Sequence, residues 1–306
     1  MKAVICTKYG SPDVLQIKEV EKPIIKNNQL LIKIVSTAVN SGDVRVRCLD
    51  VSGFLKIVMR LVIGISKPRK PVLGTVFSGV VEAVGKKVSK FKVGDKVFGM
   101  TGFNFGTYAE YTAINQNSNV LEMPRNATFD DAVSLIFGGQ TAIYFLNKAK
   151  IAEKSTHKIL IIGATGSVGT AAIQIAKHYK ADVTTVCSSA GFQLVKGLGA
   201  SNIILYDKED FTKHTNKFDI IFDAVGKTNK KGCQHMLNEN GVYQSVNGSG
   251  YASETLQQLR LLKELFEHGK FVAIIDKTFP MDKIIEAHRY VDTGRKKGNV
   301  VLRISK

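Results

Sequence analysis

The chain has 306 residues, of which 44% are hydrophobic and 23% are charged. This balance is typical of a globular protein with a sizeable core and excludes a largely disordered chain, and the length suffices for two ordinary domains. The formal net charge is +17, but the basic residues are spread along the chain without a long basic tail, so a nucleic-acid-binding arm is not indicated.

The four cysteines, Cys6, Cys48, Cys187 and Cys233, are far apart in the sequence. No CxxC spacing is present, so we interpret them as free thiols of a reducing compartment. The start, MKAVIC, has no signal-peptide layout. The most apolar run, 54–65, contains Lys56 and Arg60 and is shorter than the roughly 20 residues of a membrane span. We therefore expect a cytoplasmic protein without a transmembrane segment.

The first third of the chain is predicted to form short strands separated by turns. Apolar runs cover 30–35 and 72–84, and residues 92–99 (KVGDKVFG) alternate around a Gly-Asp turn. Many short strands with frequent turns favour a compact β barrel or sandwich.

The middle third alternates between strands and helices. Strands are expected at 158–162, 183–187, 202–205, 218–223 and 241–246, with helices at 168–179 and 192–198. This alternation predicts a parallel sheet with right-handed crossovers. A helix at 254–268, a strand at 271–275, a helix at 281–291 and a strand at 299–304 are expected to follow.

The segment KILIIGATGSVGTAAIQIA carries the strongest chemical signal. Gly163 allows a tight turn, Gly166 lets a pyrophosphate approach the backbone, and Gly169 lets helix and strand pack closely. The N–H groups at the start of the helix favour an anion. The alternative is a simple βα turn. The predicted phosphate loop consists of Gly163, Ala164, Thr165, Gly166, Ser167, Val168 and Gly169.

The end of the second strand of this unit bears on the cofactor. An NAD site places an acid there, to bind the ribose 2′-hydroxyl. The chain instead reads Val186-Cys187-Ser188-Ser189, with two hydroxyls that can donate to a 2′-phosphate. NADP(H) is therefore favoured over NAD(H). The alternative is that Ser188 and Ser189 only cap the following helix.

Several motifs in order make the whole chain resemble the medium-chain dehydrogenase/reductase superfamily, in its zinc-free quinone oxidoreductase (zeta-crystallin-like) branch. They include MKAVICTKYGSPDVLQI, VNSGDVRVR, KVGDKVFG, the GATGSVG loop, LGASNIILY and FDIIFDAVG. The resemblance implies an α/β fold: a Rossmann doubly wound parallel sheet plus a GroES-like β-barrel domain. The expected domains are 1–122 with 270–306, and 123–269. A homodimer is expected, because apolar edge strands such as 241–246 favour sheet extension.

The resemblance also implies that no metal is bound. Zinc-dependent relatives have ligands where this chain has Asn40 and Thr75, and the four-cysteine structural loop is missing. A zinc site needs Cys, His or carboxylate ligands at fixed spacing. Zinc-assisted alcohol oxidation is therefore disfavoured.

Site residues follow from the same resemblance. Asn40 and Asp43 are expected beside the nicotinamide pocket. The remaining cofactor contacts are expected from Thr141, Tyr206, Val225, Gly226, Asn247, Gly298 and Asn299. Two departures concern cofactor anchoring: a basic residue common after the second strand is replaced around Ala190 and Gly191, and a common Gly-Lys reads Gly298-Asn299.

The predicted function is zinc-independent, NADPH-dependent hydride transfer to a small carbonyl acceptor, either a quinone or an α,β-unsaturated ketone or aldehyde. Asn40, Arg45 and Arg47 are candidate donors to the developing oxyanion, although either arginine could instead serve a surface or salt-bridge role. The chain lacks the tyrosine that enoyl-thioester reductases carry after this segment, which leaves Tyr243 or Tyr251 as other possible donors.

Alternatives are an NADP-dependent alcohol dehydrogenase, an enoyl-thioester reductase, or a non-catalytic NADPH- or RNA-binding protein of the zeta-crystallin type. Nucleic acid is not the expected partner. The apolar segment 54–70 has three interpretations. Met59, Leu61 and Ile63 line a substrate pocket or lid, or the helix is plain core, or Lys56, Arg60 and Lys67 touch a membrane surface.

Overall fold

The structure is a computed structural model that describes residues 1–49, 54–153, 156–247 and 252–305. It divides into two compact units. The β unit comprises Met1–Ile136 and Ile275–Lys306, and the parallel-sheet unit comprises Phe137–Ile274. The expected domains, 1–122 with 270–306 and 123–269, have the same interrupted arrangement.

The parallel-sheet unit is built on five strands in the order β10-β9-β8-β11-β12, with parallel pairing throughout. Their bounds are β8 Lys158–Ile162, β9 Asp182–Cys187, β10 Asn202–Leu205, β11 Phe218–Asp223 and β12 Leu237–Ser245. The chain starts in the centre, moves to one edge, and returns to build the other half. This order is that of a doubly wound Rossmann sheet and confirms the prediction.

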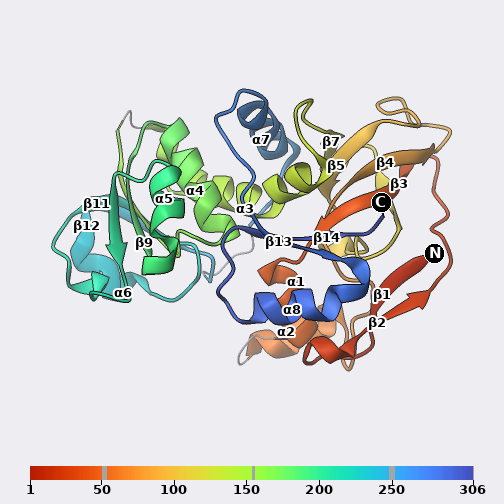
Figure 1. Cartoon of the computed structure of the whole chain (residues 1–306), viewed down its shortest axis with the longest axis horizontal. Helices are drawn as coiled ribbons and strands as arrows, with labels where there is room; N and C mark the ends of the chain where they lie inside the picture. Colours follow the sequence, from red (N-terminus) through yellow and green to blue (C-terminus); the bar gives the residue numbers. More distant parts are fainter. Residues whose placement is uncertain (50–53, 154–155, 248–251, 306) are drawn as a thin grey trace. The chain divides into compact units, whose positions relative to one another are not determined.

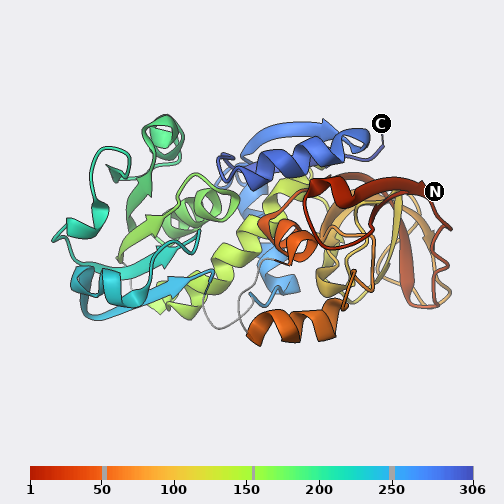
Figure 2. The same cartoon turned by 90° about the horizontal axis from the view of Figure 1, so that it is seen from below.

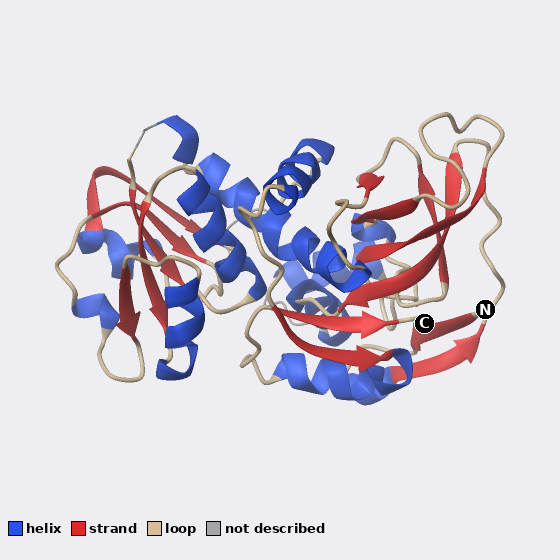
Figure 3. Cartoon of the chain, turned by 45° about the horizontal axis from the view of Figure 1, so that its top comes forward, coloured by secondary structure: helices blue, strands red, loops and turns tan. Residues whose placement is uncertain are grey.

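Helices flank this sheet, as Figure 3 shows for the unit coloured by secondary structure. They are α3 Phe129–Lys148, which begins in the β unit, α4 Ser167–His178, α5 Phe192–Gly197 and α6 Lys230–Cys233. A further helix, α7 Leu256–Glu267, packs on α3, where a Cβ on Gly139 would lie 2.5 Å from Leu262. Alternate residues of β8 serve opposite faces, because successive strand side chains point in opposite directions. Leu160 and Ile162 join one core cluster. From α3, Phe145 stacks on Phe222 of β11, with ring centroids 5.5 Å apart.

The β unit contains a seven-stranded sheet and a two-stranded ribbon of β1 Lys2–Cys6 and β2 Leu15–Glu19. The larger sheet runs β13-β14-β3-β4-β5-β7, and β6 pairs with β3. Its strands are β3 Gln29–Ala38, β4 Val76–Val84, β5 Lys96–Met100, β6 Tyr111–Asn115, β7 Val120–Glu122, β13 Ile275–Pro280 and β14 Asn299–Arg303. All pairs except β13–β14 are antiparallel.

Besides the start of α3, the described part of the β unit contains the helices α1 Ser41–Cys48, α2 Phe54–Ile63 and α8 Ile284–Asp292. Figure 1 shows α1 beside α8, and Figure 2 shows α8 running along β13 and β14. Their apolar faces share one core cluster, which includes Val46 of α1 and Ala287 of α8. The start of α1 is thereby held against a packed support.

The predicted strand 271–275 is wrong. Residues 271–274 are not in a strand, and β13 runs from Ile275 to Pro280. Phe271 is nevertheless buried, and the backbone N–H of Val272 donates to Gln174 Oε1 at 2.7 Å. The apolar residues 271–274 therefore form a packed loop, while β13 is a more polar strand at the edge of the sheet. The predicted strand 72–84 likewise begins later, at Val76.

Candidate functional site

The glycine-rich turn after β8 has the backbone that the sequence predicts. Gly163 has a φ of +75°, and a Cβ there would lie 2.3 Å from Val225 Cγ1. A Cβ on Gly169 would lie 2.3 Å from the carbonyl oxygen of Gly163 and 2.7 Å from Ala164 Cα. Since real Cβ atoms do not approach so closely, both positions require glycine. Helix α4 consequently packs directly on the turn.

Gly166 differs from its two neighbours because it faces open space. It is the N-cap of α4, with φ −71° and ψ 171°, and a Cβ there would find only the Gly163 carbonyl oxygen, at 3.7 Å. The first N–H groups of a helix have no intrahelical acceptor and, with the helix dipole, attract anions. A diphosphate therefore fits in front of this helix turn.

The loop after β9 packs on the glycine-rich turn. A Cβ on Gly191 would lie 2.3 Å from Thr165 Cγ2, so this loop follows the phosphate loop closely. The Asp207 Oδ1 atom accepts hydrogen bonds from the Ser189 backbone N–H at 2.9 Å and the Ser189 hydroxyl at 3.1 Å.

The sequence at the end of the second strand contains no carboxylate, as expected, but the fold brings the Asp207 carboxylate to that place. The expectation of a site free of carboxylates is therefore wrong. Asp207 follows β10, which is the parallel neighbour of β9. The carboxyl ends of two adjacent parallel strands lie side by side, so an acid after the third strand reaches the end of the second. Ser189 is already engaged by this acid, while Ser188 stands at the N-cap position of the short 3₁₀ turn Ser189–Gly191.

A buried carboxylate that the sequence analysis did not single out organises the loop after β11. The Asp223 side chain accepts from the backbone N–H groups of Val225, Gly226 and Thr228, at 3.1, 2.8 and 2.7 Å. Gly226 has a φ of +70°, and its carbonyl accepts from Asn247 Nδ2 at 3.0 Å. An Asp that ends a buried strand just before a glycine is the signal that could have revealed this role.

The other predicted cofactor residues vary in exposure. Thr141 on α3 is buried, whereas the Tyr206 side chain is 57% exposed after β10. In the β unit, Gly298 has a φ of +82°, and its carbonyl accepts from Lys296 Nζ at 2.6 Å. Asn299 is buried at the start of β14. Within the phosphate loop, Ala164, Ser167 and Val168 are all buried.

The two alternative tyrosines have separate outcomes. The Tyr243 hydroxyl lies 3.0 Å from Thr228 Oγ1, so it belongs to the loop that Asp223 organises. Tyr251 lies outside the described residues.

Asn40 begins helix α1 in the β unit as part of a capping box. Its side chain accepts from the backbone of Asp43, and its own backbone N–H donates to Asp43 Oδ2 at 3.0 Å. The amide nitrogen Nδ2 is buried and forms no hydrogen bond of normal geometry among the described residues, although the amide lies close enough to Asp43 to lower the pKa of its carboxyl. The capping box therefore engages the side-chain oxygen and the backbone N–H of Asn40, and Nδ2 is the part of this side chain that takes no defined role in the cap.

Asp43 is fully buried, and desolvation raises the pKa of its carboxyl to about 7. The backbone N–H of Asn40, the backbone of Gly74 and the nearby Tyr108 hydroxyl partly oppose this rise in pKa. Tyr108 influences the carboxyl by proximity, since its hydroxyl forms no hydrogen bond of normal geometry among the described residues. The buried carboxyl accepts the Asn40 backbone N–H through Oδ2, so it fixes the backbone at the start of α1.

Arg47 is committed to a structural ion pair. Its side chain is 2% exposed, and Nη2 donates to both carboxylate oxygens of Asp292 on α8, at 2.9 and 2.8 Å. The salt-bridge interpretation therefore describes Arg47 better than a donor to substrate, and we do not retain Arg47 as a catalytic candidate. Arg45 is half-buried on the same helix.

The positions where zinc-dependent relatives carry ligands do not fit a zinc ion. Asn40 is held in its capping box, and Thr75 offers a hydroxyl that is not a preferred zinc ligand. Within the described ranges, no group of three or more His, Cys, Asp or Glu side chains is arranged to hold a metal.

Helix α2 covers the first part of the apolar segment 54–70. Met59 and Ile63 are buried in the core cluster of the β unit, as the core interpretation predicts. Leu61 is 59% exposed, and Arg60 and Lys67 are exposed as well. The side chain of Lys56 lies outside the description. No described helix is long and apolar enough to cross a bilayer.

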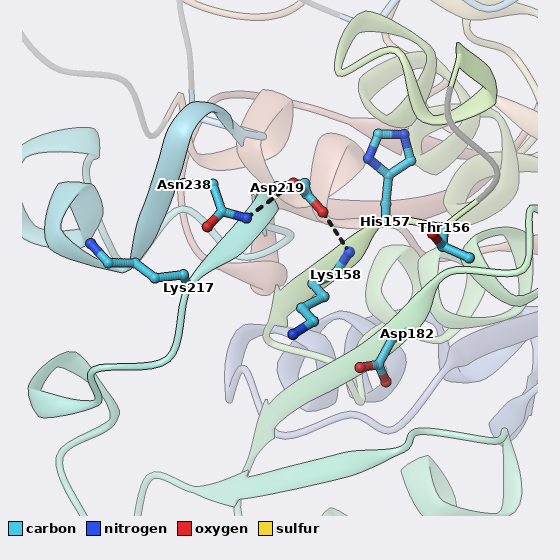
Figure 4. A pocket seen from close by; sticks show the side chains of 7 residues that line it. All are labelled: Thr156, His157, Lys158, Asp182, Lys217, Asp219 and Asn238. Carbon is cyan, nitrogen blue, oxygen red and sulfur yellow. Dashed lines mark hydrogen bonds between the residues drawn. The ribbon is translucent and has the colours of Figure 1, made fainter.

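A polar pocket of about 330 Å³ lies at the amino ends of β8, β9 and β11, opposite the phosphate loop. Figure 4 shows Asp219 in its centre, accepting from Asn238 Nδ2 at 3.0 Å and from the backbone N–H of Lys158 at 2.9 Å. A second pocket, of about 780 Å³, lies in the β unit around Phe129. No predicted site residue lines either pocket.

Taken unit by unit, the fold is that of a two-domain dehydrogenase with a Rossmann sheet and a GroES-like domain. Residues 26–125 match the family described as alcohol dehydrogenase GroES-like domain, and residues 167–274 match the family described as zinc-binding dehydrogenase. The chain belongs to the medium-chain dehydrogenase/reductase superfamily of oxidoreductases, in its quinone oxidoreductase-like branch.

Curated relatives and solved structures agree with this assignment. The chain is 36% identical to a 2-methylene-furan-3-one reductase of Solanum lycopersicum, over 99% of this chain and 79% of the relative. It is 31% identical, with the same coverage, to a chloroplastic NADPH-dependent alkenal/one oxidoreductase of Arabidopsis thaliana. The structure of a quinone oxidoreductase from Coxiella burnetii superposes with a TM-score of 0.84 at 26% identity, over 100% of this chain and 99% of that one.

Proposed function

We propose that the chain is a zinc-independent reductase that uses NADPH to reduce a quinone or an α,β-unsaturated ketone or aldehyde. The open space in front of Gly166 at the start of α4 carries the cofactor part of this proposal, because it leaves room for a diphosphate. The names of the relatives support it, because they include an NADPH-dependent alkenal/one oxidoreductase and a quinone oxidoreductase.

The residues that would hold the cofactor are those of the parallel-sheet unit. The phosphate loop would bind the diphosphate, the loop after β9 and Tyr206 the adenosine, and Thr141, Val225, Gly226 and Asn247 the remainder. Gly298 and Asn299 stay cofactor-binding candidates by resemblance. Bound NADPH would supply the hydride.

The protein's own contribution to the chemistry is a donor for the acceptor's oxygen. Asn40 Nδ2 is buried, rigidly oriented by the capping box, and has no hydrogen bond of normal geometry to a described residue. A preorganised donor of this kind stabilises negative charge as it develops on a carbonyl or quinone oxygen. Asp43 would act through Asn40 as a positioning residue, and Arg45 stays a second candidate donor.

A panel of acceptors tests the proposal. NADPH oxidation should be seen with quinones, enals or enones, and should be weaker with saturated ketones and enoyl thioesters. Activity should survive chelation of zinc. NADPH turnover restricted to saturated alcohols and ketones, and lost on chelation, would overturn the assignment.

Two variants separate cofactor binding from chemistry. In Gly166→Asp, the new side chain enters open space at an N-cap position where Asp is favourable, so the fold should be as stable as the parent. Its carboxylate would face the diphosphate, and NADPH affinity should fall by about a hundredfold or more. Asn40→Ala should instead lower kcat by about tenfold or more with little change in the Kd of NADPH. Unchanged NADPH affinity in Gly166→Asp would show that the diphosphate binds elsewhere.

We also propose a homodimer that extends the sheet of the parallel-sheet unit. Strand β12 is an edge strand in the order β10-β9-β8-β11-β12, and an unpaired edge can accept a strand from a second copy. Light scattering on the purified chain should report twice the 33.5 kDa of one copy.

A further inference from the structure

A carboxylate that follows β10 reaches the loop after β9, at the place where the adenosine ribose is expected. Asp207 Oδ1 receives two hydrogen bonds from Ser189, one from the backbone N–H and one from the hydroxyl. Burial raises the pKa of the Asp207 carboxyl, but the hydrogen bonds from Ser189 and the charge of Lys208 outweigh this effect and hold the pKa below its ordinary value. The group is therefore an anion at neutral pH.

The position of this anion relative to the phosphate loop is fixed within one unit. Gly191 contacts Thr165 of the phosphate loop, and the Tyr206 backbone N–H donates to the Cys187 carbonyl at 3.0 Å. The ends of β9 and β10 are thus tied together beside the phosphate loop. In doubly wound folds, the ribose hydroxyls of a dinucleotide lie at the end of the second strand, which is β9 here.

A carboxylate at this place has opposite effects on the two dinucleotides. It accepts a hydrogen bond from a ribose 2′-hydroxyl, as the acid of an NAD site does. It repels a 2′-phosphate and occupies the Ser189 donors that such a phosphate would need. The Ser188 hydroxyl and the nearby Lys208 ammonium would still attract a 2′-phosphate. We therefore expect the affinities for NADPH and NADH to be similar.

We propose that Asp207 is a specificity-determining residue, which allows NADH to bind and limits the preference of this chain for NADPH. The proposal rests on the proposed function, because it requires the dinucleotide to bind along the phosphate loop. It concerns only the parallel-sheet unit.

The test measures binding rather than turnover. Because the chain has no tryptophan, intrinsic tryptophan fluorescence cannot report binding. Titration calorimetry or the fluorescence of the reduced nicotinamide gives the Kd of NADPH and of NADH instead. Asp207→Asn keeps an oxygen acceptor for Ser189 and removes the charge. NADPH should bind the variant at least about tenfold more tightly, or about 1.4 kcal/mol. The Kd of NADH should stay within about threefold or rise.

Asp210→Asn is the matched control. Asp210 is also a surface carboxylate that accepts from a backbone N–H and a hydroxyl, both of Thr212, so its replacement changes the net charge equally. It should shift both dissociation constants by less than about threefold. If Asp207→Asn changes NADPH and NADH equally, or no more than the control does, the proposal is wrong. If neither the parent nor either variant binds NADPH or NADH, the proposed function itself is wrong.

A second measurement uses the unmodified chain and does not depend on how the variant folds. Adenosine 5′-monophosphate and adenosine 2′,5′-bisphosphate differ only in the 2′-phosphate. Their dissociation constants should lie within about tenfold of each other. A bisphosphate that binds more tightly by a larger factor would overturn the role given to Asp207.

Discussion

Two buried ionisable side chains in the β unit should make opposite contributions to the pH dependence of stability. Burial raises the pKa of Asp43 to about 7, from an ordinary value of 3.8. Burial, followed by the charge of Arg47, lowers the pKa of His288 to about 3, from an ordinary value of 6.5. Both groups neighbour Tyr108: its hydroxyl acts on the Asp43 carboxyl, and its ring lies nearly perpendicular to the His288 ring, with centroids 5.7 Å apart.

The signs follow from which state binds more protons. Between pH 4 and 7 the folded chain keeps a proton on Asp43 that the unfolded chain loses, so this group destabilises the fold as pH rises. Between pH 6.5 and 3 the unfolded chain binds a proton on His288 that the folded chain does not, so this group destabilises the fold as pH falls. Each slope is about 1.4 kcal/mol per pH unit, and the two cancel between about pH 4.5 and 6.5.

Single substitutions should expose each slope. His288→Leu should become more stable relative to the parent by about 3 kcal/mol as pH falls from 6.5 to 4.5. Asp43→Asn should become more stable relative to the parent by a similar amount as pH rises over the same interval. Denaturant unfolding followed by circular dichroism across this range supplies the differences.

The double variant is the control, because the difference between it and the parent should hardly change with pH. If both single variants drift in the same direction, or if neither drifts, the two side chains do not titrate as their burial requires.

Two further predictions concern stability. Gly169→Ala places a Cβ 2.3 Å from the Gly163 carbonyl oxygen and should lower the free energy of unfolding by roughly 1–3 kcal/mol. In the control Gly197→Ala, the new Cβ meets nothing within 4 Å, so this variant should be neutral or gain up to about 1 kcal/mol. Thermal melts that rank the two variants in the reverse order would contradict this packing. Asp292→Asn leaves the buried Arg47 without its counter-charge and should lower the free energy of unfolding by about 3–5 kcal/mol. Glu153→Gln removes an exposed ion pair with Lys150 and should lower it by less than about 1 kcal/mol in the same denaturation assay. Equal losses in the two variants would mean that burial does not set the difference.

The parallel-sheet unit was predictable because its signals are local. The apolar runs 158–162, 202–205 and 218–223 are the observed β8, β10 and β11 residue for residue. Buried parallel strands read as continuous apolar segments, and glycine or polar residues end them. The same logic misplaced β13, since the buried Phe271 stands just before a polar edge strand that only pairing with β14 reveals.

The polar interior of the β unit was less accessible to sequence reasoning. Arg47 and its partner Asp292 are 245 positions apart, and nothing in either local segment indicates the pairing. An arginine in a polar helix reads as a surface or substrate-binding group until the fold buries it. The capping box of Asn40 and Asp43 is local, but Gly74 and Tyr108, which also act on the pKa of the buried Asp43, come from segments farther along the chain.

The loop after β9 shows why a correct motif can still yield an incomplete site. The rule that an acid at the end of the second strand selects NAD is stated along the sequence, yet its physical content is a negative charge next to the ribose. In this chain the charge comes from Asp207, eighteen positions after Ser189, and it reaches the same place because parallel neighbours end at one edge of the sheet. A reading of cofactor preference in such folds therefore has to include the residues that follow the third strand, where the sequence Tyr206-Asp207 already contained the missing carboxylate.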